Sequence, residues 1–188
     1  MFEVELKALV HNKTETIKRL ESLSGNSLDK VRYDDIYFDK EDNLKKADKE
    51  LRIREKTNLV TQEKVCKLTF KDAPFDQKSK SKPEFETEIT DFNTGIAIFQ
   101  KLGYVISTQY TKNCLLCDLI YKHQKIEIAV VEISMLKDTF IEVEIQTENQ
   151  QETAKLFIIL YSFLEEIGIS KDEVTNEYYV DAIKNSTT

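Results

Sequence analysis

The stretch Phe2-Glu3-Val4-Glu5-Leu6-Lys7 alternates strictly between apolar and charged side chains. Because successive side chains of a β-strand point to opposite faces, this stretch predicts a strand that carries Glu3, Glu5 and Lys7 on one face. Four further stretches show the same alternation, and each repeats charges of one sign: Leu51–Arg54, Lys67–Lys71, Glu84–Ile89 and Ile141–Ile145. The charged faces of these five strands therefore decide what kind of sheet the chain forms.

The rest of the sequence also alternates mainly with a period of two. This pattern predicts eight or nine strands, at residues 1–10, 32–39, 50–57, 62–71, 84–90, 104–112, 114–121, 124–132 and 139–147. Helical periodicity predicts helices at 14–24, 92–102 and 150–167, and a last helix that Ser170 caps and that reaches Ile183. The predicted class is α+β. The 188 residues are enough for one domain, which we expect at 1–184 with a frayed tail at 185–188.

The composition excludes several classes of protein. A net charge of −7 argues against non-specific binding to nucleic acid or to an anionic membrane surface. The four glycines are too far apart for a GxGxxG turn or a Walker loop, which excludes those nucleotide-binding motifs. Three cysteines, the absence of a leader-like N-terminus and the absence of a long apolar run lead us to expect a cytoplasmic protein.

Two sheet geometries fit the charged faces. In an open sheet, helices cover the apolar face and the charged face is solvated. In a closed barrel of about eight strands, the charged side chains lie inside, around space for one small ligand. Glu-x-Glu occurs in different strands from Arg-x-Arg and Lys-x-x-x-Lys, which favours the barrel. Clustered carboxylates would bind Mg²⁺ or Mn²⁺ and facing cations would bind phosphate, which together indicate a polyphosphate ligand.

Seven short motifs follow one another along the chain: ExExK at Glu3–Lys7, D-x-Y-[FY]-D at Asp35–Asp39, LRxR at Leu51–Arg54, LTxK at Leu68–Lys71, ExE at Glu86–Glu88, F-x-E-x-E at Phe140–Glu144 and a closing pair at Tyr178–Tyr179. This ordered set resembles the CYTH family, the triphosphate tunnel metalloenzymes, which includes class IV adenylyl cyclases, thiamine triphosphatases and inorganic triphosphatases. The resemblance implies a closed eight-stranded antiparallel β-barrel, the triphosphate tunnel, with helices on the outside.

The resemblance also implies a role for each matching residue. The implied ligands of Mg²⁺ or Mn²⁺ are Glu3, Glu5, Glu142 and Glu144, and the implied triphosphate-binding residues are Lys7, Arg52, Arg54, Lys71 and Lys112. Tyr37 and Lys71 correspond to a pair implicated in hydrolysis, and Glu86, Glu88 and Glu132 to supporting acids. The implied partner is ATP, inorganic triphosphate or thiamine triphosphate, and the cyclase branch commonly forms homodimers.

Two positions lack an arginine that the family usually has. Cys114 replaces the arginine of a K-x-R motif, and Glu84 stands where an arginine often precedes ExE, although Lys82 is close. The acid nearest to a usual L-D motif is Glu132, in imperfect register. The overall similarity favours a class IV adenylyl cyclase, which converts ATP to cyclic AMP and pyrophosphate. A triphosphatase and a non-catalytic polyphosphate or nucleotide binder stay open as alternatives.

Overall fold

The computed structural model describes residues 2–74 and 82–186, with the side chains of residues 184 and 186 left aside. These residues form one antiparallel sheet whose strands are β1 (Phe2–Leu9), β2 (Asp29–Asp39), β3 (Glu50–Asn58), β4 (Lys64–Lys71), β5 (Glu84–Ile89), β6 (Val105–Tyr121), β7 (Gln124–Ile133) and β8 (Thr139–Thr147). The strand order is β1-β8-β7-β6-β2-β3-β4-β5. The predicted eight-stranded antiparallel α+β fold is therefore confirmed.

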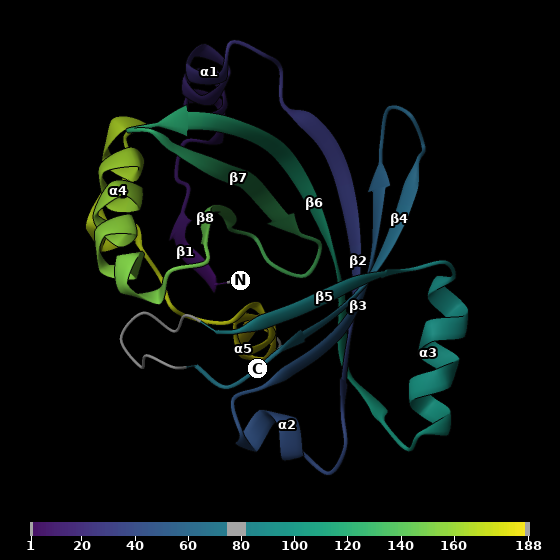
Figure 1. Cartoon of the computed structure of the whole chain (residues 1–188). Coiled ribbons are helices and arrows are strands. Elements are labelled where there is room, and N and C mark those ends of the chain that lie inside the picture. The colour runs from purple at the N-terminus through teal and green to yellow at the C-terminus, as the bar shows by residue number, and fades with distance from the viewer. Residues whose placement is uncertain (1, 75–81, 187–188) are drawn as a thin grey trace.

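The sheet curls around an interior, as Figure 1 shows. We call the face that carries Glu3, Glu5 and Lys7 the inner face, and the opposite one the outer face. Among the described residues, β1 and β5 are the two edge strands, and a single bridge between Phe2 and Pro83 pairs them. The sheet thus differs from a barrel that a continuous ladder closes.

The free edge of β1 is covered by the C-terminal part of the chain. Val174 forms a bridge with Ala8, and the Thr175 amide donates a hydrogen bond of 2.8 Å to the carbonyl of Lys7. The ammonium group of Lys71 on β4 reaches across to the carboxylate of Glu3 at 2.5 Å. The C-terminal segment therefore covers the edge of β1, and the contact between Lys71 and Glu3 links β4 to β1.

Helices pack on the outer face. On this face lie α1 (Lys13–Ser24), α2 (Asn43–Lys46), α3 (Phe92–Lys101) and α4 (Thr153–Glu166), and the short 3-10 turns η1 (Gln150–Glu152) and η2 (Lys171–Glu173) flank α4. The last helix, α5 (Tyr179–Ser186), instead packs on the inner face, in a cluster with Phe140 and Val131. In Figure 1, α4 lies against β1 and β8, and α3 lies on the opposite side of the molecule, against β3. None of the helices in the described ranges is long and apolar enough to cross a membrane.

The main core lies between α1, α4 and the outer face, where apolar residues alternate with the inner-face charges. Val4 and Leu6 of β1 and Val143 of β8 are buried there against Leu160 and Phe163 of α4. Burying each of these side chains contributes about 1.5–3 kcal/mol, which fixes the register of β1 and β8. The same alternation that builds the core therefore directs the glutamates inward.

Two predicted elements differ in the structure. The strands expected at 104–112 and 114–121 form one strand, β6, because its first part pairs with β2 and its last part with β7. The last helix does not begin at Ser170, because a capping box between Ser170 and Glu173 closes only the short turn η2. The chain then extends along β1, and α5 follows as far as residue 186, so residues 185 and 186 are helical where we expected a frayed tail.

Candidate functional site

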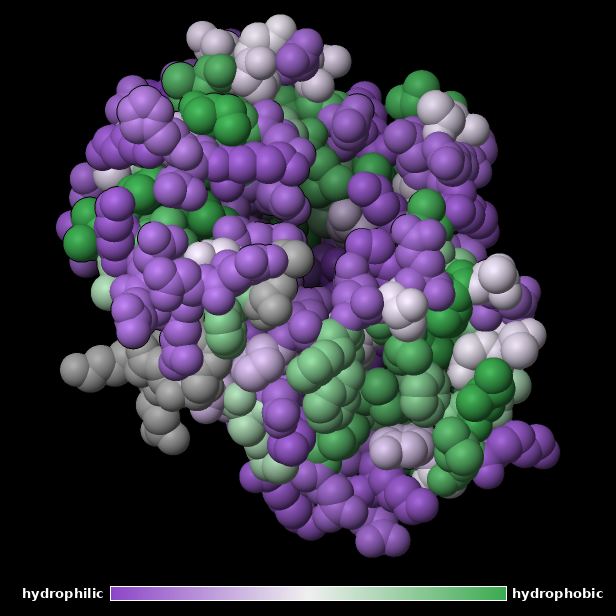
Figure 2. Space-filling view, viewed as in Figure 1, coloured by the Kyte–Doolittle hydropathy of each residue, from purple (hydrophilic) through white to green (hydrophobic). Residues whose placement is uncertain are grey.

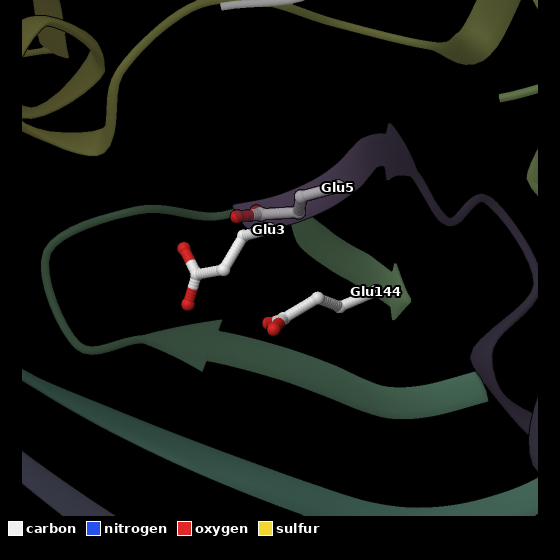
Figure 3. Close-up of side chains that lie close together, drawn as sticks. All are labelled: Glu3, Glu5 and Glu144. Carbon is white, nitrogen blue, oxygen red and sulfur yellow. The ribbon is translucent and has the colours of Figure 1, made fainter. Parts of the chain in front are cut away.

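Three carboxylates meet on the inner face at β1 and β8. Glu5 and Glu144 are direct cross-strand partners, and Glu3 precedes Glu5 by two residues on the same face. One carboxylate oxygen from each residue lies within 4.8 Å of the other two, and Figure 3 shows the three side chains gathered around a common space. Strand alternation and register, rather than any loop, position this cluster.

The electrostatics of the cluster suit a cation. Burial raises the pKa of Glu3 to about 7, and its hydrogen bond with Glu84 adds to the effect. Burial and the negative charges of Glu3 and Glu5 raise the pKa of Glu144 to about 9. Loss of hydration inside the curled sheet and the negative charge of Glu142 also raise the pKa of Glu5. A set of carboxylate oxygens that repel one another is the donor set that Mg²⁺ and Mn²⁺ accept, so these residues fit the implied metal.

Glu142, the fourth predicted metal ligand, has a different environment. Its carboxylate accepts a hydrogen bond of 3.0 Å from the ammonium group of Lys112. Burial alone would raise the pKa of Glu142, but the charge and the hydrogen bond of Lys112 hold it at about 2. The structure therefore brings three of the four predicted ligands together and pairs the fourth with a predicted phosphate-binding lysine.

The two arginines of β3 are held in different ways. Arg54 donates two hydrogen bonds to Asp35, of 2.5 and 2.6 Å, and its guanidinium lies 4.3 Å from the centre of the Tyr33 ring. Arg52 donates through Nη2 to Thr69 at 3.3 Å, whereas its Nε is buried and has no hydrogen-bond partner among the described residues. A buried donor without a partner is costly, so an anion beside Arg52 would satisfy it.

The predicted lysines also lie on the inner face. The ammonium group of Lys71 is 2.5 Å from Glu3 and 3.3 Å from Glu84. Burial alone would lower the pKa of Lys71, but the charges of Glu3 and Glu84 raise it above its ordinary value, so Lys71 remains a cation. Lys7 donates a hydrogen bond to the carbonyl of Glu177. Lys82, on the other hand, bonds Asp48 and Glu50 and is 7% exposed, so it anchors the start of β5.

Tyr37 and Lys71 have separate hydrogen-bond partners. The hydroxyl of Tyr37 lies 2.9 Å from that of Tyr110, and the two rings stack with centroids 5.6 Å apart. Lys71 instead donates a hydrogen bond to the carboxylate of Glu3 and forms an ion pair with that of Glu84. Tyr110 was missed by the sequence analysis, although its place two residues before Lys112 on an alternating strand puts it on the same face.

The three supporting acids divide between the two faces. Glu86 accepts hydrogen bonds from Lys67 at 2.5 Å and Thr69 at 3.1 Å, and Glu88 is the cross-strand partner of Lys67 on the inner face. Glu132 was predicted to support the site, and this prediction does not agree with the geometry. Glu132 shares the outer face of β7 with the buried Ile128 and Val130, and it pairs with Lys13 of α1 at 2.7 Å.

Two acids that the sequence analysis missed, Asp118 and Glu127, lie in line with Glu144 and Glu5 across neighbouring strands and form a row of carboxylates with them. Cross-strand pairing places Asp118 opposite Glu127, Glu127 opposite Glu144, and Glu144 opposite Glu5. Lys125 lies 2.8 Å from Asp118 and 3.2 Å from Glu127. Each acid occurs alone in an alternating strand, so only the register between strands reveals the row. Figure 2 shows hydrophilic residues around the hollow at the centre of this view.

Comparisons with known proteins agree with this arrangement. The protein "Putative adenylate cyclase MJ0240" of Methanocaldococcus jannaschii is 28% identical over 182 residues, which cover 96% of this chain and 98% of that protein. The solved structure of the PH1819 protein of Pyrococcus horikoshii is similar with a TM-score of 0.80, at 24% identity over 97% of this chain and 98% of that one. The structure of HpAC1 from Hippeastrum, whose title states a dominant triphosphatase activity, has a TM-score of 0.63, at 18% identity over 98% and 95% of the two chains.

The family to which the chain belongs follows from one further match. The model of the CYTH domain matches residues 1–179, which include every strand of the curled sheet and the cluster of Glu3, Glu5 and Glu144. This match covers far more than half of the chain. The chain therefore belongs to the CYTH domain family.

Proposed function

We propose that this protein processes a small-molecule triphosphate together with a divalent cation, and that it acts on ATP as a class IV adenylyl cyclase does. The observation that carries the proposal is the carboxylate cluster of Glu3, Glu5 and Glu144, which shares one curled inner face with Arg52 and its unpartnered Nε. Family membership implies dependence on a divalent metal and binding of a triphosphate. The carboxylate cluster fits a divalent metal, and the buried Nε of Arg52 fits a phosphate oxygen.

The residues of the inner face would have three roles: binding the metal, binding phosphate oxygens and positioning the phosphate-binding side chains. Glu3, Glu5 and Glu144 would hold the metal, which would supply charge neutralisation of the phosphate oxygens. Arg52 would contact a phosphate oxygen through its buried Nε, which has no hydrogen-bond partner among the described residues. Asp35 would hold the Arg54 guanidinium in a fixed orientation through its two short hydrogen bonds. Positioning of this kind accounts for much of the catalysis of phosphoryl transfer.

Two features support the cyclase reaction, in which the 3′-oxygen of ATP attacks the α-phosphorus and pyrophosphate leaves. The 28% identical relative that covers nearly the whole chain bears the name of an adenylate cyclase. In addition, the hydroxyl of Tyr37 is engaged by Tyr110, and the ammonium group of Lys71 by Glu3 and Glu84. Among the described residues, no hydrogen bond therefore joins Tyr37 to Lys71, the pair associated with hydrolysis.

A triphosphatase is the second candidate. In that reaction water attacks the terminal phosphorus, and the same metal ligands and cations would serve. The similar fold of HpAC1, with its stated dominant triphosphatase activity, favours this candidate, as does the presence of both Tyr37 and Lys71 on the inner face. Substrate binding would have to release Lys71 from Glu3 before the lysine could approach Tyr37.

The experiment incubates the protein with ATP, inorganic triphosphate or thiamine triphosphate, each with Mg²⁺ or Mn²⁺, and separates the products. Cyclic AMP with pyrophosphate identifies the cyclase, and orthophosphate identifies the triphosphatase. Glu5→Gln should lose activity, whereas the matched variant Glu132→Gln, whose acid lies on the outer face, should keep it. If the wild-type protein forms no more product than Glu5→Gln on all three substrates but binds them, it is a non-catalytic binder.

A further inference from the structure

The first residue of α5, Tyr179, is inserted among the cations of the inner face. The ammonium groups of Lys7 and Lys112 lie 4.2 and 4.4 Å from the centre of its ring. Both distances are within the range of a cation–π interaction. The ring is only 7% exposed, although it belongs to the closing motif to which the proposed function assigns no role. Tyr179 therefore covers two of the lysines proposed to bind phosphate.

Neighbouring groups hold the ring in this position. Its centroid lies 5.2 Å from that of Phe140 and 6.4 Å from that of Tyr110, and both contacts are edge-on. The preceding segment is fixed to β1, because the Thr175 amide bonds the Lys7 carbonyl and the Glu177 carbonyl accepts from the Lys7 side chain. Tyr179 is thus a packed part of the wall, and moving it requires several contacts to break.

The character of the inner face changes at this ring. On β1, the acids Glu3 and Glu5 come first, Lys7 lies about 7 Å beyond Glu5 along the strand, and Leu9 follows. Leu9 and Phe140 line a cavity of about 500 Å³ together with residues of α5. Tyr179 therefore stands between the lysines Lys7 and Lys112 and a cavity of mixed polar and apolar lining.

We propose that Tyr179 sets the length of the phosphate chain that the inner face accepts. A triphosphate with one end at the acidic cluster would extend as far as Lys7 and Lys112, where the ring blocks further progress. A longer chain would have to displace the ring from both lysines. This inference rests on the proposed triphosphate site, and it makes Tyr179 a determinant of substrate length.

The test measures the affinities of inorganic triphosphate and tetraphosphate by calorimetry in the presence of Mn²⁺. The wild-type protein should bind triphosphate about tenfold more tightly than tetraphosphate, a ratio worth about 1.4 kcal/mol. Tyr179→Ala should bring this ratio to about threefold or less. The matched variant Ile183→Ala truncates a buried residue of the same helix and should keep the wild-type ratio. Tyr179→Phe, which retains the ring, should keep it as well.

The possible failures can be told apart. If Tyr179→Ala shows the wild-type ratio, or if the wild-type protein does not discriminate between the two chains, the role of Tyr179 in length selection is refuted while the triphosphate site stands. If the wild-type protein binds neither chain, the proposed function itself fails. Should circular dichroism show that Tyr179→Ala is unfolded, the milder truncation Tyr179→Leu removes the ring from both lysines. Its ratio should then fall to about threefold or less, and a wild-type ratio refutes the role of Tyr179.

Discussion

The replacement Asp35→Asn tests whether the inner-face cations depend on buried partners. The side chain of Asp35 has no exposed surface, and that of Arg54 is 17% exposed. The two hydrogen bonds between them are short and parallel, which is the geometry of a strong arginine–carboxylate pair. Asparagine has nearly the same shape but carries no charge, so the variant leaves a buried guanidinium without its counter-ion.

The expected loss of stability is large. Burial alone would raise the pKa of Asp35, but the charge and hydrogen bonds of Arg54 lower it from 3.8 to about 2, which corresponds to about 2 kcal/mol in favour of the folded state at neutral pH. Removing one partner of a buried ion pair usually costs about 3–5 kcal/mol. Because solvent reaches part of Arg54, we expect about 3 kcal/mol, or a fall in Tm of about 6–12 °C for a chain of this size.

The difference between wild type and Asp35→Asn should also depend on pH. The folded-state pKa of Asp35 is lowered, so its contribution is fully present above about pH 4 and is lost as the pH falls through about 2. The stability gap should therefore stay constant from pH 7 to about pH 4 and narrow below it. Other carboxylates titrate equally in both proteins, so the comparison isolates Asp35.

The assay is urea unfolding followed by far-ultraviolet circular dichroism, since the chain has no tryptophan. The control is Asp34→Asn, which changes the adjacent residue on the opposite face, where Asp34 pairs with the half-exposed Arg32. We expect the control to lose about 1 kcal/mol or less. Equal losses in the two variants, or a gap that does not change between pH 4 and pH 2, would refute the reasoning.

Two further predictions concern the carboxylate cluster and the β6–β7 ladder. Glu144→Gln removes an acid whose pKa burial and the charges of Glu3 and Glu5 raise to about 9, so it should stabilise the metal-free protein at neutral pH by about 1 kcal/mol. It should also abolish the rise in Tm that Mn²⁺ gives the wild type, as differential scanning calorimetry can measure. Cys114→Arg buries a guanidinium beside Val131, so it should destabilise the protein by about 3 kcal/mol in urea unfolding, and Cys114→Arg with Val131→Asp should recover most of the loss.

Much of the fold could be predicted because one alternating pattern serves two purposes. In β1, the residues Val4 and Leu6 pack against α4, and the same spacing obliges Glu3 and Glu5 to face inward. Any strand with a buried outer face has this property, since a slip by one residue would expose the whole apolar set. The faces of the site residues on β1, β3, β4 and β8 therefore follow from sequence alone.

Contacts between strands were harder to predict, because they depend on register and on the position of the C-terminal segment. Glu132 was predicted to support the site from its closeness to a motif, but alternation with the buried Val131 directs it outward to Lys13. The separation of Tyr37 from Lys71 likewise depends on which neighbours each finds in space, namely Tyr110 for the first and Glu3 for the second. No local pattern contains this information.

Cys114, which replaces the usual arginine of the K-x-R motif, meets an apolar residue across the β6–β7 ladder. Cys114 and Val131 are direct cross-strand partners on the inner face, 3% and 0% exposed, and Val31 of β2 lies opposite Cys114 on its other side. An arginine alone or an acid alone at this packed position would be a buried charge without a partner, so the two positions are expected to change together. The apolar contact leaves intact the cations on β1, β3 and β4 and the acidic cluster at Glu3. Cys114 is therefore better explained as half of a repacked pair than as a defect in the phosphate site.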